Sequence, residues 1–246
     1  MPSTLEEILR SPVGRNSAHW LKWAEGWWAN QDFWSLYEMC VVAALRFSEG
    51  ADGLDDIPSG GDILAEARIL AHTIDHHPLA HHLMRATSPQ VHIGNLEEDV
   101  PAERNTGRET CYGKPKEVLW TSSLIANQSS WRAAIDSSFV PVAESKLNEY
   151  RLSFDISKAK IFNIDSVDDV TTLARSYGTP EGGQATIDWS AMRNDYDAVH
   201  LSFRGLVTTQ GVAVSSANGA YAIKSWDCES TAWLNSDQFA GQVRRT

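Results

Sequence analysis

Two acidic residues near the end of the sequence, Asp227 and Glu229, have a type and spacing that could do chemistry. They lie in the segment Trp226-Asp227-Cys228-Glu229-Ser230-Thr231, between bulky residues. On a β-strand, a spacing of two points both carboxylates to the same face. Neighbouring carboxylates in a water-poor place raise each other's pKa and cost stability. The pair is therefore either a solvated strand end or a site where a carboxylate stabilises a developing positive charge.

Hydroxyl groups gather at the end of another expected strand. The run Leu119-Trp120-Thr121-Ser122-Ser123 passes from apolar residues to three hydroxyls. Such a run is either a polar strand edge or a set of hydrogen-bonding groups that hold a carboxylate and a ribose. Upstream, Arg85 stands between apolar residues in Leu83-Met84-Arg85-Ala86-Thr87, which we expect to be a strand. An arginine with buried flanks usually meets an anion.

Other kinds of site have weaker support. Histidines cluster near residue 76, and His72 and His76 would share one helix face, as zinc ligands do. No glutamate or cysteine completes a ligand set there, so polar histidines at a helix C-terminus are the preferred interpretation and no metal is predicted. Cys111 and Cys228 lack the surroundings typical of a nucleophile. The sequence contains no phosphate-binding glycine motif and no nucleophile elbow.

Taken in order, Arg85, Thr121-Ser122-Ser123 and Asp227-x-Glu229 resemble the Arg, Ser-Thr-Ser and Glu-x-Glu signature of the arginine–serine–glutamate class of ADP-ribosyltransferases. The resemblance covers about residues 80–240. It departs from the class in two places. The hydroxyl triplet reads Thr-Ser-Ser, and Asp227 stands where the class has Glu or Gln, a position that helps to choose the acceptor.

The resemblance implies NAD+ as substrate, bound in the cleft of a split, mixed sheet. Glu229 would bond the ribose 2′-hydroxyl and stabilise the oxocarbenium-like state as nicotinamide leaves, much as carboxylates do in glycoside cleavage. The hydroxyl triplet beside Trp120 would position Glu229 and the nicotinamide. Trp131 would stack on the nicotinamide, although packing is the preferred interpretation for this residue. Arg85 would contact the phosphates or a ribose, with Arg104, Arg108 and Arg151 as alternatives.

The elements that must position these residues follow from hydrophobic periodicity. Residues 17–47 predict one or two helices with a stripe that includes Trp20, Trp27 and Trp34, and a further helix starts near residue 62. Short strands are expected at 81–87, 118–123, 150–155, 160–164, 198–203, 221–226 and 230–235, with a capping box at Ser166 and a helical turn at 187–194. We therefore predict an α+β chain. Residues 1–78 form a Trp-rich helical region, and residues 79–246 form an ADP-ribosyltransferase-like split mixed β-sheet domain that binds NAD.

The composition of the chain limits the binding partners and the cellular location that we expect. The net charge of −11 disfavours bulk attraction to nucleic acid or to an anionic membrane. No secretory signal or membrane span is evident, and three widely spaced cysteines suit a reduced, cytoplasmic location. We therefore expect no membrane partner, and the sequence leaves the oligomeric state open.

Three functions remain at this point. The leading one is mono-ADP-ribosyl transfer from NAD+ to a macromolecular acceptor, for which the acidic charge favours a protein over nucleic acid, as in a toxin or phage-type effector. A second is NAD+ glycohydrolase activity, in which water is the acceptor. In the third, the acids and hydroxyls are surface groups and the Trp-rich helices form a non-enzymatic interaction module.

Overall fold

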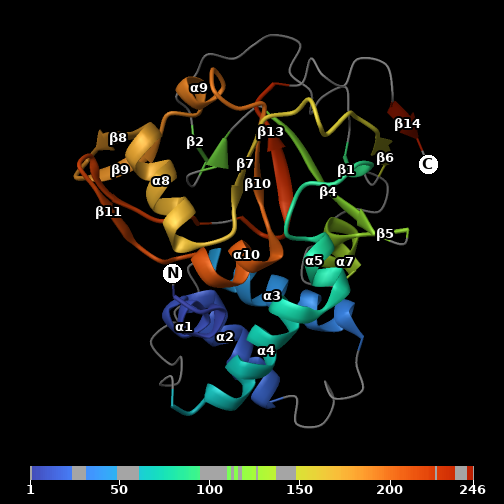
Figure 1. The fold of residues 1–246 in the computed structure, drawn as a ribbon, viewed down its shortest axis with the longest axis vertical. Helices are drawn as coiled ribbons and strands as arrows, with labels where there is room; N and C mark the ends of the chain where they lie inside the picture. Colours follow the sequence, from blue (N-terminus) through green and yellow to red (C-terminus); the bar gives the residue numbers. More distant parts are fainter. Residues whose placement is uncertain are drawn as a thin grey trace.

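A computed structural model describes residues 2–23, 32–48, 61–94, 110–111, 114–115, 118–125, 127–136, 148–224, 226–235 and 243–245. In it, a group of helices from the first third of the chain lies against one end of a mixed sheet (Figure 1). The chain is thus α+β, as predicted.

The helices before the sheet pack on one another and on a late helix. They are α1 (Thr4–Arg10), α2 (Pro12–Trp23), α3 (Phe33–Ser48), α4 (Leu64–His76) and α5 (Pro78–His82). Ser3 begins α1 with a capping box, in which its hydroxyl accepts from the backbone N–H of Glu6 and the Glu6 carboxylate accepts from that of Ser3. Among the described members of the predicted tryptophan stripe, Trp34 packs against the core. Trp27 lies outside the described residues.

The main sheet has the strand order β14-β6-β1-β4-β13-β10-β7, with β5 paired to β4. Its strands are β1 (Gln90–Ile93), β4 (Leu119–Ile125), β5 (Gln128–Ser129), β6 (Glu149–Leu152), β7 (Ile161–Ile164), β10 (Ala198–Leu201), β13 (Ser230–Trp233) and β14 (Val243–Arg245). Strands β7 and β10 are parallel, whereas the other strand pairs described in this sheet are antiparallel. In register, Thr231 on β13 faces Thr121 on β4 on one side and His200 on β10 on the other.

Smaller elements surround this sheet. A second sheet has the order β11-β12-β9-β8, and β2 pairs with β3. Their bounds are β2 (Thr110–Cys111), β3 (Lys114–Pro115), β8 (Gly178–Glu181), β9 (Gln184–Ile187), β11 (Val214–Ser216) and β12 (Gly219–Tyr221). The remaining helices are α7 (Ser130–Asp136), α8 (Val167–Tyr177), α9 (Trp189–Met192) and α10 (Phe203–Thr209).

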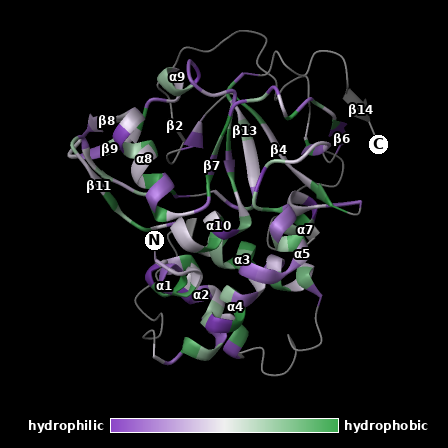
Figure 2. Ribbon diagram, in the orientation of Figure 1, coloured by the Kyte–Doolittle hydropathy of each residue, from purple (hydrophilic) through white to green (hydrophobic). Residues whose placement is uncertain are grey.

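One hydrophobic cluster joins the helical part to the sheet. Ile8 from α1, Leu70 from α4 and Leu206 from α10 belong to the same set of buried side chains as Val199 and Ala232 from the sheet. Helix α10 contacts α1, α2 and α3. Hydrophobic residues dominate α3, whereas the β8–β9 hairpin at the margin is more hydrophilic (Figure 2). The division predicted after residue 78 falls within α5, after its first residue, and packing crosses it.

Most of the expected elements are present. The capping box at Ser166 opens α8, and strands lie at five of the seven predicted places. The strand expected over 81–87 is wrong, because Pro78 begins helix α5 and a turn follows. The strand expected over 221–226 is wrong beyond Tyr221, where β12 ends. Within the described part of the chain, none of the helices combines the length and apolar character needed to cross a bilayer.

Candidate functional site

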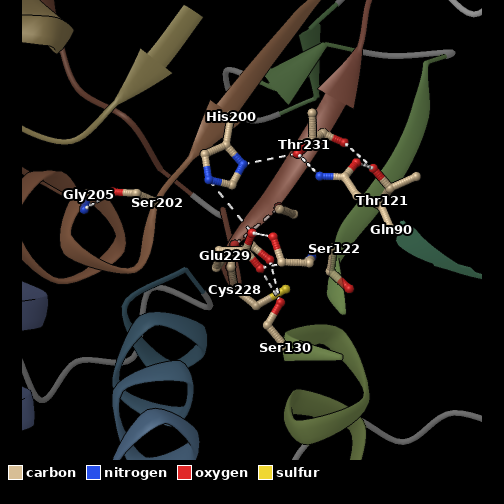
Figure 3. A network of polar contacts seen from close by, with 12 residues as sticks. Gln90, Thr121, Ser122, Ser130, His200, Ser202, Gly205, Cys228, Glu229 and Thr231 are labelled. Atoms are coloured by element: carbon tan, nitrogen blue, oxygen red, sulfur yellow. Dashed lines mark hydrogen bonds and ion pairs between the residues drawn. The ribbon is translucent and has the colours of Figure 1, made fainter. Parts of the chain in front are cut away.

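Glu229 is the residue just before β13, and its carboxyl group is buried beside side chains from β4, α7 and β10 (Figure 3). Ser123 on β4 donates from its hydroxyl to Oε1 at 2.8 Å and from its backbone N–H to Oε2 at 3.3 Å. Ser130, the first residue of α7, donates to Oε2 and also lies 3.0 Å from the Glu229 carbonyl oxygen. The hydroxyl strand and the acidic segment therefore meet, as the resemblance requires.

Burial decides the charge of this carboxyl. Desolvation raises the pKa of Glu229 to about 7, against the opposing effect of the bonds from Ser130 and Ser123. His200 Nε2 lies 3.7 Å from Oε1, but burial lowers the pKa of His200 to about 3. Although the distance would allow an ion pair, the imidazole is neutral at physiological pH. Glu229 is therefore poised between its neutral and ionised forms near neutral pH.

A web of side-chain hydrogen bonds fixes the strands around Glu229. Gln90 on β1 donates from Nε2 to Thr231 Oγ1 at 2.9 Å and accepts at Oε1 from the Thr121 hydroxyl. Trp233 Nε1 donates to Thr121 Oγ1 at 2.9 Å and to Gln90 Oε1 at 3.2 Å. Because these residues come from β1, β4 and β13, the web holds the register of the three strands.

The N-terminal helices reach the same place through Tyr37 on α3. Its hydroxyl accepts a hydrogen bond from the Glu229 backbone N–H at 2.9 Å. The ring is fully buried and lies 5.3 Å from the ring of Phe203 on α10. The helical region thus forms part of the wall around Glu229.

Asp227 lies in a different environment from Glu229. Its carboxylate is 42% exposed and pairs with Lys114 Nζ at 2.9 Å. The prediction that the two acids form a same-face pair on a strand is wrong, because β13 begins only at Ser230. Asp227 is also absent from the causes that raise the pKa of Glu229. Burial, rather than a neighbouring carboxylate, sets the state of Glu229.

A pocket of about 270 Å³ lies beside this site, and three tryptophan rings form part of its wall. Trp120 and Trp226 meet edge to face at 5.1 Å, and Lys114 Nζ lies 5.8 Å from the centre of the Trp120 ring. The lining residues are Leu45, Lys114, Trp120, Trp131, Ala134, Ile135, Trp226, Asp227, Cys228 and Ser230. Glu229 itself does not line the pocket, although both of its chain neighbours do.

The structure also shows the surroundings of Ser122 and Cys228, which the sequence had brought into consideration. Ser122 accepts a hydrogen bond from the Trp131 backbone N–H at 3.3 Å, so it holds the start of α7 rather than the Glu229 carboxylate. Cys228 is buried, and desolvation raises the pKa of its thiol, with a further increase from Asp227 and Glu229. The thiol therefore stays protonated, which disfavours a nucleophilic role.

Arg85 does not occupy a strand beside the hydroxyl run. It is exposed, in the turn after α5, and its charge acts on Asp165 instead. The strand next to β4 is β1, which carries Gln90 and His92. His92 Nδ1 lies 2.8 Å from the Trp120 carbonyl oxygen, and its ring meets that of Trp131 edge to face at 6.1 Å.

Of the alternative arginines, Arg151 is the one that the structure describes. Arg151 lies on β6, which pairs with β1 rather than with β4. Arg104 and Arg108 lie outside the described residues. Strand β1, which pairs with β4, carries no arginine.

Sequence reasoning missed Gln90, Ser130, His200 and Tyr37. Only His200 carried a local signal, a histidine within the otherwise apolar strand Ala-Val-His-Leu. In the cluster of histidines near residue 76, the rings of His72 and His76 lie 4.6 Å apart on one helix face. Among the described residues, no group of three His, Cys, Asp or Glu side chains could hold a metal ion.

Protein-family models, curated proteins and solved structures gave no match to this chain. The interpretation of the site therefore rests on its geometry.

Proposed function

We propose that this chain cleaves NAD+ at the nicotinamide–ribose bond and transfers ADP-ribose to a macromolecular acceptor, with Glu229 as the catalytic carboxylate. The observation that carries the proposal is the double hydrogen bond from Ser123 to Glu229. It joins the hydroxyl run to the acidic segment, as the ADP-ribosyltransferase resemblance demands. The order β1-β4-β13 supports the split mixed sheet of that class, with Gln90 and His92 in place of an arginine.

The chemistry needs an ionised carboxylate. As nicotinamide leaves, positive charge develops on the ribose, and a fixed carboxylate in a site of low dielectric stabilises it strongly. Because the pKa of Glu229 is raised to about 7, the ionised fraction grows as the pH rises through neutrality. The rate of NAD+ cleavage should therefore increase over the same range.

The aromatic pocket supplies a place for a flat ring. Trp120, Trp131 and Trp226 offer stacking surfaces for nicotinamide or adenine. Trp131 belongs to α7, the helix whose first residue, Ser130, bonds to Glu229. Because the carboxylate is fully buried and bonded to Ser130, the proposal requires that the site open before NAD+ contacts Glu229.

The test is incubation of the protein with labelled NAD+, with and without cell lysate. We expect label to enter protein, and Glu229→Gln to lower the rate roughly 100- to 1,000-fold, as loss of such a group does. Glu181→Gln is the matched control, because Glu181 is exposed on β8, in the second sheet.

The alternatives give different results in this assay. Nicotinamide released at full rate without an acceptor, and with no label on any macromolecule, identifies a glycohydrolase. No NAD+ binding in calorimetry, together with equal turnover by wild type and Glu229→Gln, would refute the proposal and leave the helical interaction module.

A further inference from the structure

His200 occupies a bridging place between the hydrogen-bonded web and Glu229. It is fully buried in β10, in register with Thr231 on β13. Its Nδ1 lies 3.0 Å from Thr231 Oγ1, and its Nε2 lies 3.7 Å from Glu229 Oε1 (Figure 3). Among the described residues Nε2 has no hydrogen-bond partner, which is unusual for a buried ring nitrogen. One edge of the ring is thus fixed by Thr231, while the other faces the carboxyl without bonding to it, and the Leu83 backbone also interacts with the ring.

The web determines which nitrogen of His200 carries the proton. The indole N–H of Trp233 can only donate, so the atom of the Gln90 side chain that faces it must be the oxygen. The Gln90 amide nitrogen then donates to Thr231 Oγ1. The hydroxyl proton of Thr231 is left to bond to His200 Nδ1, the other polar atom within reach. A neutral His200 therefore carries its proton on Nε2, which points toward Glu229.

We propose that His200 is a positioning residue that donates its Nε2–H to Glu229 Oε1 when the carboxyl ionises. A small approach of the ring and the carboxylate turns the 3.7 Å contact into a charge-assisted hydrogen bond. The neutral carboxyl is a weaker acceptor than the carboxylate, so it gains less from this donor. His200 thus favours the ionised form, which the proposed cleavage uses. The inference deepens the proposed function, but it concerns an equilibrium that can be measured without NAD+.

Other titratable groups do not compete for this role. Tyr37 from α3 and the adjacent Cys228 are the remaining ionisable neighbours that interact electrostatically with Glu229. Burial raises the pKa of both, so both stay neutral across the pH range in which Glu229 titrates. Ser123 and Ser130 do not ionise. The two serines already donate to the carboxyl, and the Tyr37 hydroxyl accepts from the Glu229 N–H. Among these described neighbours, His200 Nε2 is therefore the facing nitrogen that is still without a hydrogen bond.

Two variants of His200 separate its donation to Glu229 from its bond to Thr231, in which Nδ1 is the acceptor. In His200→Gln, the amide nitrogen can reach the place of Nε2 and keep a donor toward Glu229. In His200→Asn, the shorter amide can contact Thr231 but not Glu229. We expect His200→Asn to weaken the acidity of Glu229 roughly 10- to 100-fold, and His200→Gln to restore most of it, because bonds to charged groups have about this strength.

The measurement is a pH titration followed by NMR of glutamate carboxyl carbons labelled with ¹³C. The resonance of Glu229 is identified by its loss in Glu229→Gln. His92→Asn serves as the control, because His92 Nδ1 bonds to the Trp120 carbonyl oxygen rather than to Glu229. An unchanged Glu229 titration in a folded His200→Asn protein would overturn the proposal.

A second measurement needs no variant. Nitrogen-15 shifts of His200 in the wild-type protein should report a protonated Nε2 and an unprotonated Nδ1 at pH 6. The opposite tautomer would also overturn the proposal. Because neither experiment contains NAD+, failure here is distinct from failure of the proposed function. If NAD+ is cleaved, His200→Asn should also shift the pH profile of kcat upward, whereas a purely structural role would lower kcat at every pH.

Discussion

Replacing Glu229 by glutamine should change how the stability of the protein depends on pH. Burial raises the pKa of the folded-state carboxyl from 4.5 to about 7. The folded state therefore binds this proton more tightly than the unfolded state does. The resulting stabilisation is complete below about pH 4.5 and is lost as the pH rises through 7. Glutamine does not titrate, so the variant lacks this loss.

The size of the effect follows from the two pKa values. Each unit of difference corresponds to about 1.4 kcal/mol, so a rise from 4.5 to about 7 corresponds to about 3 kcal/mol. The free energy of unfolding of the wild type, minus that of Glu229→Gln, should fall by about this amount between pH 4.5 and 8. For a chain of this length, that is roughly 6–12 °C in relative Tm.

The assay is urea unfolding followed by tryptophan fluorescence, at a series of pH values for both proteins. Taking the difference between them cancels the titration of groups that both share. Glu181→Gln is the control, because Glu181 is exposed and a change there should alter the difference by less than about 0.5 kcal/mol. A difference between wild type and Glu229→Gln that stays constant with pH would show that the carboxyl does not titrate as its burial requires.

Two more variants test the walls of the site. Ser123→Ala should lower kcat for NAD+ cleavage by roughly 10-fold or more, because Ser123 bonds to the Glu229 carboxyl. Ser122→Ala loses its bond to Trp131 and should mainly raise KM. Nicotinamide release measures kcat and KM for each variant, and equal losses of kcat in the two variants would contradict the geometry. Tyr37→Phe leaves the buried Glu229 N–H without an acceptor and should lower the free energy of unfolding, measured by urea titration, by about 1–3 kcal/mol. Tyr177→Phe is the control, because it removes an exposed hydrogen bond to Asp195 and should cost less stability.

Local signals predicted the elements that are governed by local physics. The capping box at Ser166 opens a helix because the reciprocal bonds between Ser166 and Asp169 satisfy free backbone groups within four residues. The prediction of a strand over 81–87 is wrong because a short apolar run fits a strand or a helix equally well. The deciding residue, Pro78, fits the first helical position, where no N–H is needed.

In the site, too, some contacts could be predicted from local motifs and others depend on long-range packing. The meeting of Ser123 with Glu229 could be inferred because their motifs lie on strands that the resemblance places side by side. His200 and Ser130 could not be inferred, because their contacts depend on strand register and on where α7 begins. Ser130 and Glu229 are 99 residues apart, and no short pattern specifies such a pair. The exposed position of Arg85 likewise depends on the turn that follows α5.

The hydrogen bond between Tyr37 and the Glu229 backbone joins residues that are 192 positions apart. During synthesis, α3 leaves the ribosome long before β13 exists, and its aromatic face lacks Phe203 and Glu229 as partners until late. The helices thus carry exposed apolar surface through most of translation, a condition that favours aggregation or chaperone binding. Formation of the carboxylate site is coupled to synthesis of Glu229 and β13, so a ribosome-bound fragment that ends before them lacks the site.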